Sequence, residues 1–191
     1  EKLKVDYVFL PNNNEIYQRG IKRKINIQKK DEILCAKYRK GHFQGVLAVM
    51  DRYLENIPAK YVFLGEKDYQ QFFLIKKYLH KKYSCKIISC KTIRNKNRLP
   101  LSSRNINLSK INLKNSEKIS QLIFNFRNVI FKEFRKISLI NKYRTKIKFL
   151  CDNLEYFEIR NPKNLSKKIS KKNFRIFIAY RQNNIRLIDN I

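Results

Sequence analysis

The sequence has few of the residues that break a chain into tight turns: its 191 residues include four glycines, four prolines and no tryptophan. It has no Gly-rich phosphate loop and no Ser/His/Asp pattern, so a Walker-type NTPase and a triad hydrolase have little support. The cysteines show no C-x-x-C spacing, which argues against a zinc site or a disulfide framework. We expect all four to be reduced and structural, with the second and third in a strand-like run where both could be buried: Cys35, Cys85, Cys90 and Cys151.

Long apolar runs are also missing. None is long enough to cross a bilayer, and we find no signal peptide, so we expect a cytoplasmic protein without a membrane partner. The chain opens with Glu1 rather than Met, directly on a core-like strand. We therefore expect a fragment or a truncated frame.

Acidic residues are scarce, with 15 Asp and Glu against 44 Lys and Arg, for a net charge of +29. That charge suggests a polyanionic partner such as RNA, DNA or an anionic membrane. The alternative is mutational bias, because the enriched Lys, Ile and Asn have AT-rich codons and the basic residues are spread along the chain. With 43% hydrophobic and 13% aromatic residues, the chain can build a core despite 31% charge.

Apolar periodicity in the first half alternates between strands and helices. Two amphipathic helices are predicted over 42–56 and 68–83, the second with Asp68 as its N-cap. Strands are predicted before, between and after them: a buried one at 5–11, a half-exposed one at 24–28, a buried one at 60–64 and a last one at 85–93. This alternation predicts a parallel α/β sheet.

The pattern changes after Arg104. Helices are predicted over 115–137 and 142–152, and strands over 154–161, 173–181 and 185–191. Helices followed by strands indicate a small α+β domain, with a boundary near residues 105–109. We therefore expect two domains, 1–105 and 106–191.

The stretch "GEKDYQQ", residues 65–71, lies where a strand ends and a helix begins, which is where α/β sheets place ligands. The helix N-terminus suits an anionic oxygen, and Lys67 adds a charge that suits phosphate. Asp68 could cap the helix or help to hold Mg²⁺ through water. Gln71 follows one turn later with an amide for a hydroxyl or a carboxylate. An ordinary turn with a helix cap remains the alternative.

Two further clusters contain anion-binding residue types. "LSSRN", residues 101–105, follows the next strand, and its two hydroxyls and arginine make a phosphate clamp, although ordinary loops share this composition. "RKGHF", residues 39–43, opens the first helix, where His42 can donate to an anion or transfer a proton. A helix-start residue without a role is the alternative for His42.

The stretches "RKGHFQGV", "FLGEKDYQQ" and "LPLSSRNINLS", followed by "IRLIDNI", together resemble the pantothenate synthetase (pantoate–beta-alanine ligase) family from about Lys4 to the C-terminus. This family joins pantoate to β-alanine with ATP through a pantoyl-adenylate, releasing AMP and diphosphate. The resemblance implies a Rossmann-like nucleotidyltransferase domain, incomplete at its N-terminus, and a small α+β C-terminal lid. It also implies a homodimer.

The resemblance assigns roles at the matching positions. Gln71, Arg39 and His42 would hold pantoate, and Asp68 would hold Mg²⁺ either directly or through water. The residues expected to be catalytic are Lys67, Ser102, Ser103, Arg104 and His42. The residues expected to bind ATP are Gly65, Glu66, Lys67, Asp68, Ile93, Leu101, Ser102, Ser103 and Arg104.

The chain departs from the family pattern at two places. The family starts with a strand leading to a His-x-Gly-His motif and has an upstream Gln for pantoate, and neither is in this sequence. The family usually has Asp-Gly before the serines, where this chain has Asn97 and Arg98. We expect little or no ligase activity from these residues alone. The alternatives are a catalytically impaired fragment and a basic nucleic-acid-binding protein that reuses the fold; we expect no specific nucleic acid partner.

Overall fold

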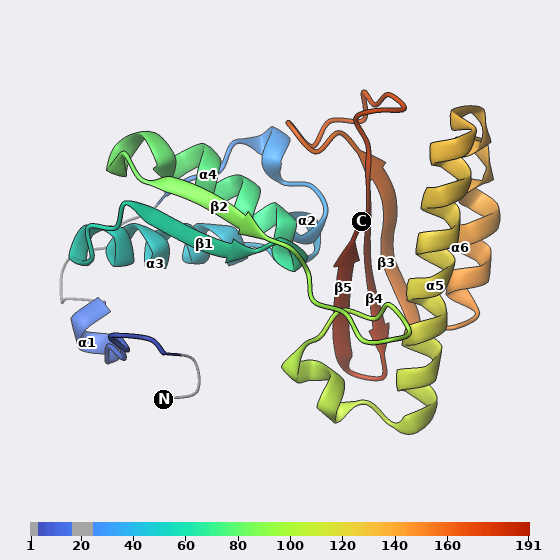
Figure 1. Cartoon of the computed structure of the whole chain (residues 1–191), viewed down its shortest axis with the longest axis horizontal. Coiled ribbons are helices and arrows are strands. Elements are labelled where there is room, and N and C mark those ends of the chain that lie inside the picture. The colour runs from blue at the N-terminus through green and yellow to red at the C-terminus, as the bar shows by residue number, and fades with distance from the viewer. Residues whose placement is uncertain (1–3, 17–24) are drawn as a thin grey trace.

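The computed structural model describes residues 4–16 and 25–191. In the first half, β1 (Tyr61–Gly65) and β2 (Lys86–Cys90) pair in parallel, with Val62 opposite Ile87. The helices α3 (His42–Asn56) and α4 (Tyr69–Tyr83) pack on one face of this sheet (Figure 1). The core between them contains side chains from both helices and from the sheet: Leu47, Leu54, Ile75, Leu79, Cys85 and Ile87.

Local sequence explains the ends of α3. It begins after Gly41, whose φ of 76° is a left-handed conformation that glycine adopts without steric cost. It ends at Asn56 because Pro58 disfavours a helical conformation at Ile57, which is extended. The predicted helix over 42–56 is confirmed.

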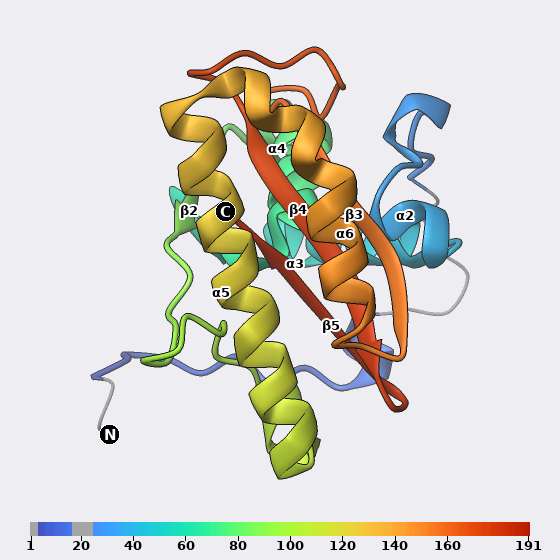
Figure 2. The same cartoon turned by 90° about the vertical axis from the view of Figure 1, so that its right-hand side faces the viewer.

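The second half forms an antiparallel sheet in the order β3-β4-β5, built from β3 (Asn153–Arg160), β4 (Arg175–Gln182) and β5 (Ile185–Asn190). Asn183 adopts a left-handed φ of 52° in the two-residue turn between β4 and β5, as such hairpins favour. The helices α5 (Lys110–Lys132) and α6 (Ile140–Lys148) cover one face of this sheet (Figure 2).

The opposite face of the antiparallel sheet packs against the first half of the chain. Tyr156, Phe177 and Ala179 from the strands share a core with Leu34 and Phe43. Leu34 precedes the short helix α2 (Cys35–Tyr38), and the 3-10 turn η2 (Glu66–Asp68) leads into α4 nearby. The division into domains 1–105 and 106–191 stays a prediction, since this core joins both parts.

The predicted buried strand over 5–11 was wrong. Residues 5–10 form no strand, and Tyr7 and Leu10 are 94% and 86% exposed. Apolar composition predicted burial, but burial of a strand needs a neighbouring strand and a covering layer, and this segment pairs with neither β1 nor β2. Phe9 instead touches the ring of Tyr53 edge-on, and the helix α1 (Asn13–Ile16) follows.

Three further strand predictions need correction. For 24–28, Lys24 lies outside the described residues, and 25–28 form no strand although they alternate between half-buried and exposed. β1 is not buried, because the sheet face opposite the helices leaves Phe63 63% exposed. The strand expected over 85–93 stops at Cys90, which is exposed, while Cys85 is buried. All four cysteines are free, as predicted.

Helix boundaries differ from the predictions where caps decide them. α5 begins five residues before the predicted start at 115, because Ser109 caps it by accepting from Asn112 N at 3.2 Å. α6 ends at Lys148, short of the predicted 152. Asp68 occupies the N-cap position of α4, but its side chain makes no capping hydrogen bond. Among the described residues, no helix combines the length and apolarity that a membrane span requires.

Candidate functional site

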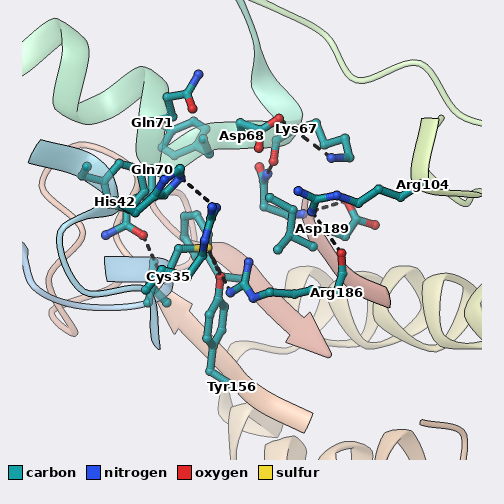
Figure 3. Close-up of a pocket in the computed structure, with 17 residues that line it drawn as sticks. Cys35, His42, Lys67, Asp68, Gln70, Gln71, Arg104, Tyr156, Arg186 and Asp189 are labelled. Atoms are coloured by element: carbon teal, nitrogen blue, oxygen red, sulfur yellow. Dashed lines mark hydrogen bonds and ion pairs between the residues drawn. The ribbon is translucent and has the colours of Figure 1, made fainter. Parts of the chain in front are cut away.

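A cavity opens where the starts of α3 and α4 face β5 and β3 (Figure 3). The structure brings six predicted site residues to its wall: Arg39, His42, Lys67, Asp68, Gln71 and Arg104. Ser102 lines an adjoining pocket that shares Lys67 and Arg104 with the first. The remaining predicted residues line neither pocket: Gly65, Glu66, Ile93, Leu101 and Ser103.

Arg39 and His42 form a pair at the start of α3. Arg39 Nη1 lies 2.7 Å from His42 Nε2, and a guanidinium has only donors, so Nε2 accepts and the imidazole is neutral with its proton on Nδ1. Burial, then the charges of Arg39 and Arg186, lower the pKa of His42. Burial and Arg186 also lower the pKa of Arg39. The pair therefore presents one permanent cation beside a neutral ring.

The turn after β1 carries Lys67 and Asp68 to the cavity. Lys67 Nζ lies 3.8 Å from Asp68 Oδ2, longer than a hydrogen bond, and the Lys67 side chain is 20% exposed. Gln71 lines the same cavity, and its side chain makes no hydrogen bond within the described ranges 4–16 and 25–191. The ammonium and the amide are thus both available to a ligand.

Gln70, next to Gln71, has a structural role instead. Its Oε1 accepts from Cys35 N at 2.9 Å, and its Nε2 donates to Ile33 O at 2.7 Å. Leu34, between these two residues, has a left-handed φ of 50°, which is unfavourable for a leucine. Gln70 therefore stabilises the bend at Leu34, which precedes α2 and the Arg39 that follows it.

The loop before Ser102 contains a left-handed residue at Arg98. Arg98 has a φ of 71°, and Asn95 Oδ1 accepts from the backbone N–H groups of Asn97 and Leu99, each at 3.0 Å. Beyond it, Ser102 Oγ accepts from Arg104 N at 3.3 Å. The Asn95 side chain therefore stabilises the turn at Arg98.

Sequence reasoning missed the strand residues that form the floor of the cavity. Arg186 on β5 donates to both carboxylate oxygens of Glu155 at 2.7–3.1 Å, and its Nη2 lies 3.4 Å from Cys35 Sγ. Burial opposes the charge of Arg186, but the hydrogen bond to Glu155 and the nearby Cys35 raise its pKa overall. The sequence does contain a signal for this pair, because Glu155 and Arg186 carry opposite charges within otherwise apolar strands.

Tyr156 on β3, another missed strand residue, contacts Cys35 of α2 at the cavity. Cys35 Sγ and Tyr156 Oη lie 3.0 Å apart, and either can donate. Burial, then the neighbouring Cys35, raise the pKa of Tyr156 well above its ordinary value. The phenol therefore stays protonated and can act as the donor.

Arg104 reaches across to this floor. Its Nη1 donates to the backbone oxygen of Arg186 at 3.0 Å, so the loop that follows β2 touches β5. Together with Lys67 and Arg39, it surrounds the cavity with positive charge from three separate segments. Such an arrangement favours a ligand with several anionic oxygens.

Comparison with known proteins identifies the chain. All of it, residues 1–191, matches the family model described as pantoate-beta-alanine ligase. A bifunctional pantoate ligase/cytidylate kinase of Prochlorococcus marinus subsp. pastoris is 37% identical over 191 residues, which are 97% of this chain and 37% of that protein. A pantothenate synthetase of Buchnera aphidicola subsp. Acyrthosiphon pisum is 38% identical over 204 residues, which are 100% of this chain and 69% of that protein.

Solved structures agree. A pantothenate synthetase from Thermus thermophilus matches with a TM-score of 0.88 and 25% identity, over 100% of this chain and 70% of that one. A Francisella tularensis pantoate-beta-alanine ligase, complexed with beta-gamma ATP and beta-alanine, has a TM-score of 0.77 and 34% identity, over 100% and 66% of the two chains. These likenesses confirm the predicted α/β nucleotidyltransferase class. The chain belongs to the pantoate-beta-alanine ligase family.

Proposed function

We propose that this chain contributes to the ATP-dependent joining of pantoate and β-alanine through a pantoyl-adenylate. The observation that carries the proposal is the convergence of Lys67, Arg39 and Arg104 on one cavity, beside the amide of Gln71. Family membership supports the reaction, and so does the related Francisella tularensis enzyme that was solved with beta-gamma ATP and beta-alanine.

The proposed roles follow from charge development. When the pantoate carboxylate attacks the α-phosphorus of ATP, negative charge builds on the phosphoryl oxygens. Lys67 and Arg104 stabilise that charge, and the Ser102 hydroxyl donates from the adjoining pocket. Gln71 and the Arg39–His42 pair orient pantoate. The bond between the α-phosphorus and the β-phosphate oxygen breaks, and diphosphate leaves. The amine of β-alanine then attacks the acyl carbon and loses a proton, and AMP leaves.

The predicted ATP residues outside the cavity have other proposed contributions. Leu101 N donates to Ile93 O at 2.9 Å, and the two side chains are 55% and 69% exposed, so they offer an apolar surface to the adenine ring. Gly65 and Glu66 contribute through the backbone of the turn, because the Glu66 carboxylate is paired with Arg175. Ser103 is the first residue of the 3-10 turn η3 (Ser103–Asn107), and its backbone helps to set the position of Arg104, the next residue.

Mg²⁺ fits the same proposal. Within the described ranges no cluster of three or more His, Cys, Asp or Glu residues could hold a metal. Mg²⁺ instead often binds through one or two carboxylates, water and substrate phosphates. Asp68, on the cavity wall, would hold it through water, and the ion would neutralise charge on the phosphates. A homodimer and a cytoplasmic location complete the proposal.

ATP binding tests this function directly. We expect calorimetry to detect Mg²⁺-ATP binding, and Lys67→Gln and Arg104→Gln each to weaken it about tenfold, the usual worth of one charged hydrogen bond. Lys81→Gln is the matched control, because Lys81 is exposed on α4. AMP formation from ATP, pantoate and β-alanine is measured beside binding. Equal affinity in all four proteins would contradict the proposal.

A further inference from the structure

The turn that carries Lys67 is held by side chains of β4 and β5. Asp68 does not cap α4 with its side chain. Instead, two backbone carbonyls of the turn accept from the side chain of Asn190 at the end of β5. Asn190 Nδ2 donates to Glu66 O at 3.0 Å and to Lys67 O at 2.9 Å.

Asn190 can hold these carbonyls because its own orientation is fixed. It is 4% exposed, and its Oδ1 accepts from Arg175 Nη1. A guanidinium has only donors, so the amide oxygen must face Arg175 and the NH₂ group must face the turn. The Asn190 backbone N–H donates to Asp189 Oδ1 at 2.7 Å. Every polar atom of the Asn190 side chain thus has a partner.

Arg175 secures the same turn through a second attachment. Its Nη2 donates to Glu66 Oε1 at 2.9 Å, and its guanidinium lies 4.2 Å from the centre of the Tyr69 ring, in the first turn of α4. Side chains on β4 and β5 therefore hold residues on both sides of Lys67. None of these contacts uses the Lys67 ammonium, which remains at the cavity wall.

We infer that Asn190 is a positioning residue, assisted by Arg175, which orients the 66–68 turn so that Lys67 meets the phosphates of ATP. This inference rests on the proposed function. Asn190 lines the cavity beside Lys67, and it acts on the turn through the two carbonyls. Its loss should therefore weaken recognition of the phosphates and leave recognition of the nucleoside unchanged.

Asn190→Asp tests this role with a side chain of the same size. The carboxylate keeps the pairing with Arg175 but has no hydrogen for Glu66 O and Lys67 O. We expect ATP affinity to fall about tenfold while adenosine affinity stays constant, because the displaced Lys67 ammonium and the new negative charge both affect only the phosphates. Hydrogen exchange separates these two effects. The control is Asn184→Asp, the same substitution at an exposed position in the turn between β4 and β5. Equal losses for ATP and adenosine would indicate a merely structural role and overturn the inference.

Hydrogen exchange of the ligand-free protein gives a readout that does not depend on ATP. We expect the amides of residues 66–70 to exchange faster in Asn190→Asp than in the unsubstituted chain and in Asn184→Asp. Unchanged exchange there would overturn the positioning role. If the unsubstituted chain bound neither ATP nor adenosine, the proposed function would fail, and exchange alone would decide the role of Asn190.

Discussion

The cations around the cavity differ in what already neutralises them. Arg186 is paired with Glu155, so its charge is compensated before any ligand arrives. Within the described residues, three other cations have no carboxylate oxygen within hydrogen-bond distance: Arg39, Lys67 and Arg104. Concentrating like charges in a folded protein is unfavourable unless an anion binds. At the residue scale, the site is therefore arranged for an anionic ligand that the protein itself does not supply.

His42 makes this arrangement sensitive to pH. Burial, then Arg39 and Arg186, lower the pKa of His42 from its ordinary value of about 6.5. The unfolded chain then binds a proton more readily than the folded one. The free energy of unfolding is thus unaffected by His42 above about pH 6.5 and decreases as the pH falls from there toward the folded pKa.

We expect Arg39→Gln to raise the pKa of His42, because the substitution removes the second-largest cause of its lowering. Imidazole NMR titration measures the change, and His42→Gln assigns the resonance. Arg135→Gln, at an exposed position away from the cavity, serves as the control. A His42 pKa that is the same in both arginine variants would show that the pair at 2.7 Å has no electrostatic effect.

At the scale of elements, one ion pair attaches the loop after β2 to β5. Arg94 donates to both carboxylate oxygens of Asp189, each at 2.8 Å, and its guanidinium lies 5.0 Å from the ring centre of Phe124 on α5. The Asp189 side chain is 3% exposed. Burial raises the pKa of Asp189, and Arg94 opposes that rise. The loop that leads to Ser102 thus depends on a charge at the edge of the antiparallel sheet.

We expect Arg94→Met to lower the free energy of unfolding by about 3–5 kcal/mol, because it leaves a buried carboxylate unpaired. Urea denaturation measures the loss. Adding Asp189→Asn should restore much of it, since the second change removes the buried charge. Arg98→Met is the control, because Arg98 lies 4.6 Å from the same Phe124 ring without this ion pair. Equal losses from the two arginine variants would attribute the effect to the ring contact.

Helices with a clear hydrophobic periodicity could be predicted from the sequence. Which segments another layer covers could not be predicted. The helix over 42–56 was confirmed because helical spacing, Gly41 and Pro58 are local signals. The exposure of residues 5–10 and of Phe63 depends on whether another layer covers them, which apolar composition does not report.

The same limit applies to the site. The clusters around Lys67, Ser102 and His42 carry their chemistry in consecutive residues, and the cavity brings Lys67 and His42 together. Glu155 and Arg186 are separated by 31 residues and meet only through the register of the antiparallel sheet. A one-residue shift in pairing would turn either side chain to the opposite face.

For the whole molecule, the net charge of +29 exceeds what the cavity needs. A groove of about 980 Å³ lies apart from the cavity wall except at Tyr69, and it contains aromatic and basic side chains. Within the described residues, three of its lysines have no carboxylate partner: Lys30, Lys76 and Lys163. This groove is a candidate surface if the basic residues serve a polyanion.

We expect nucleic acid binding to be non-specific and to disappear near about 0.15 M salt, because distributed charges bind through counterion release. Fluorescence anisotropy with two unrelated single strands across a salt series measures this. Replacing Lys30, Lys76 and Lys163 by Gln should have the same effect as replacing the exposed Lys110, Lys114 and Lys118 of α5. Sequence-selective binding at that salt, lost only in the groove variant, would instead support a nucleic acid function.

The core that joins Leu34 and Phe43 to Phe177 and Ala179 also constrains folding during synthesis. A ribosome releases the first half of the chain well before β4 exists, so the apolar side chains that await this strand stay uncovered meanwhile. Domains normally fold as units when they emerge, and uncovered apolar surface invites aggregation. The cavity floor forms only after β5 is made, so the nascent chain depends on β4 and β5 both to bind a ligand and to cover the apolar side chains of α2 and α3.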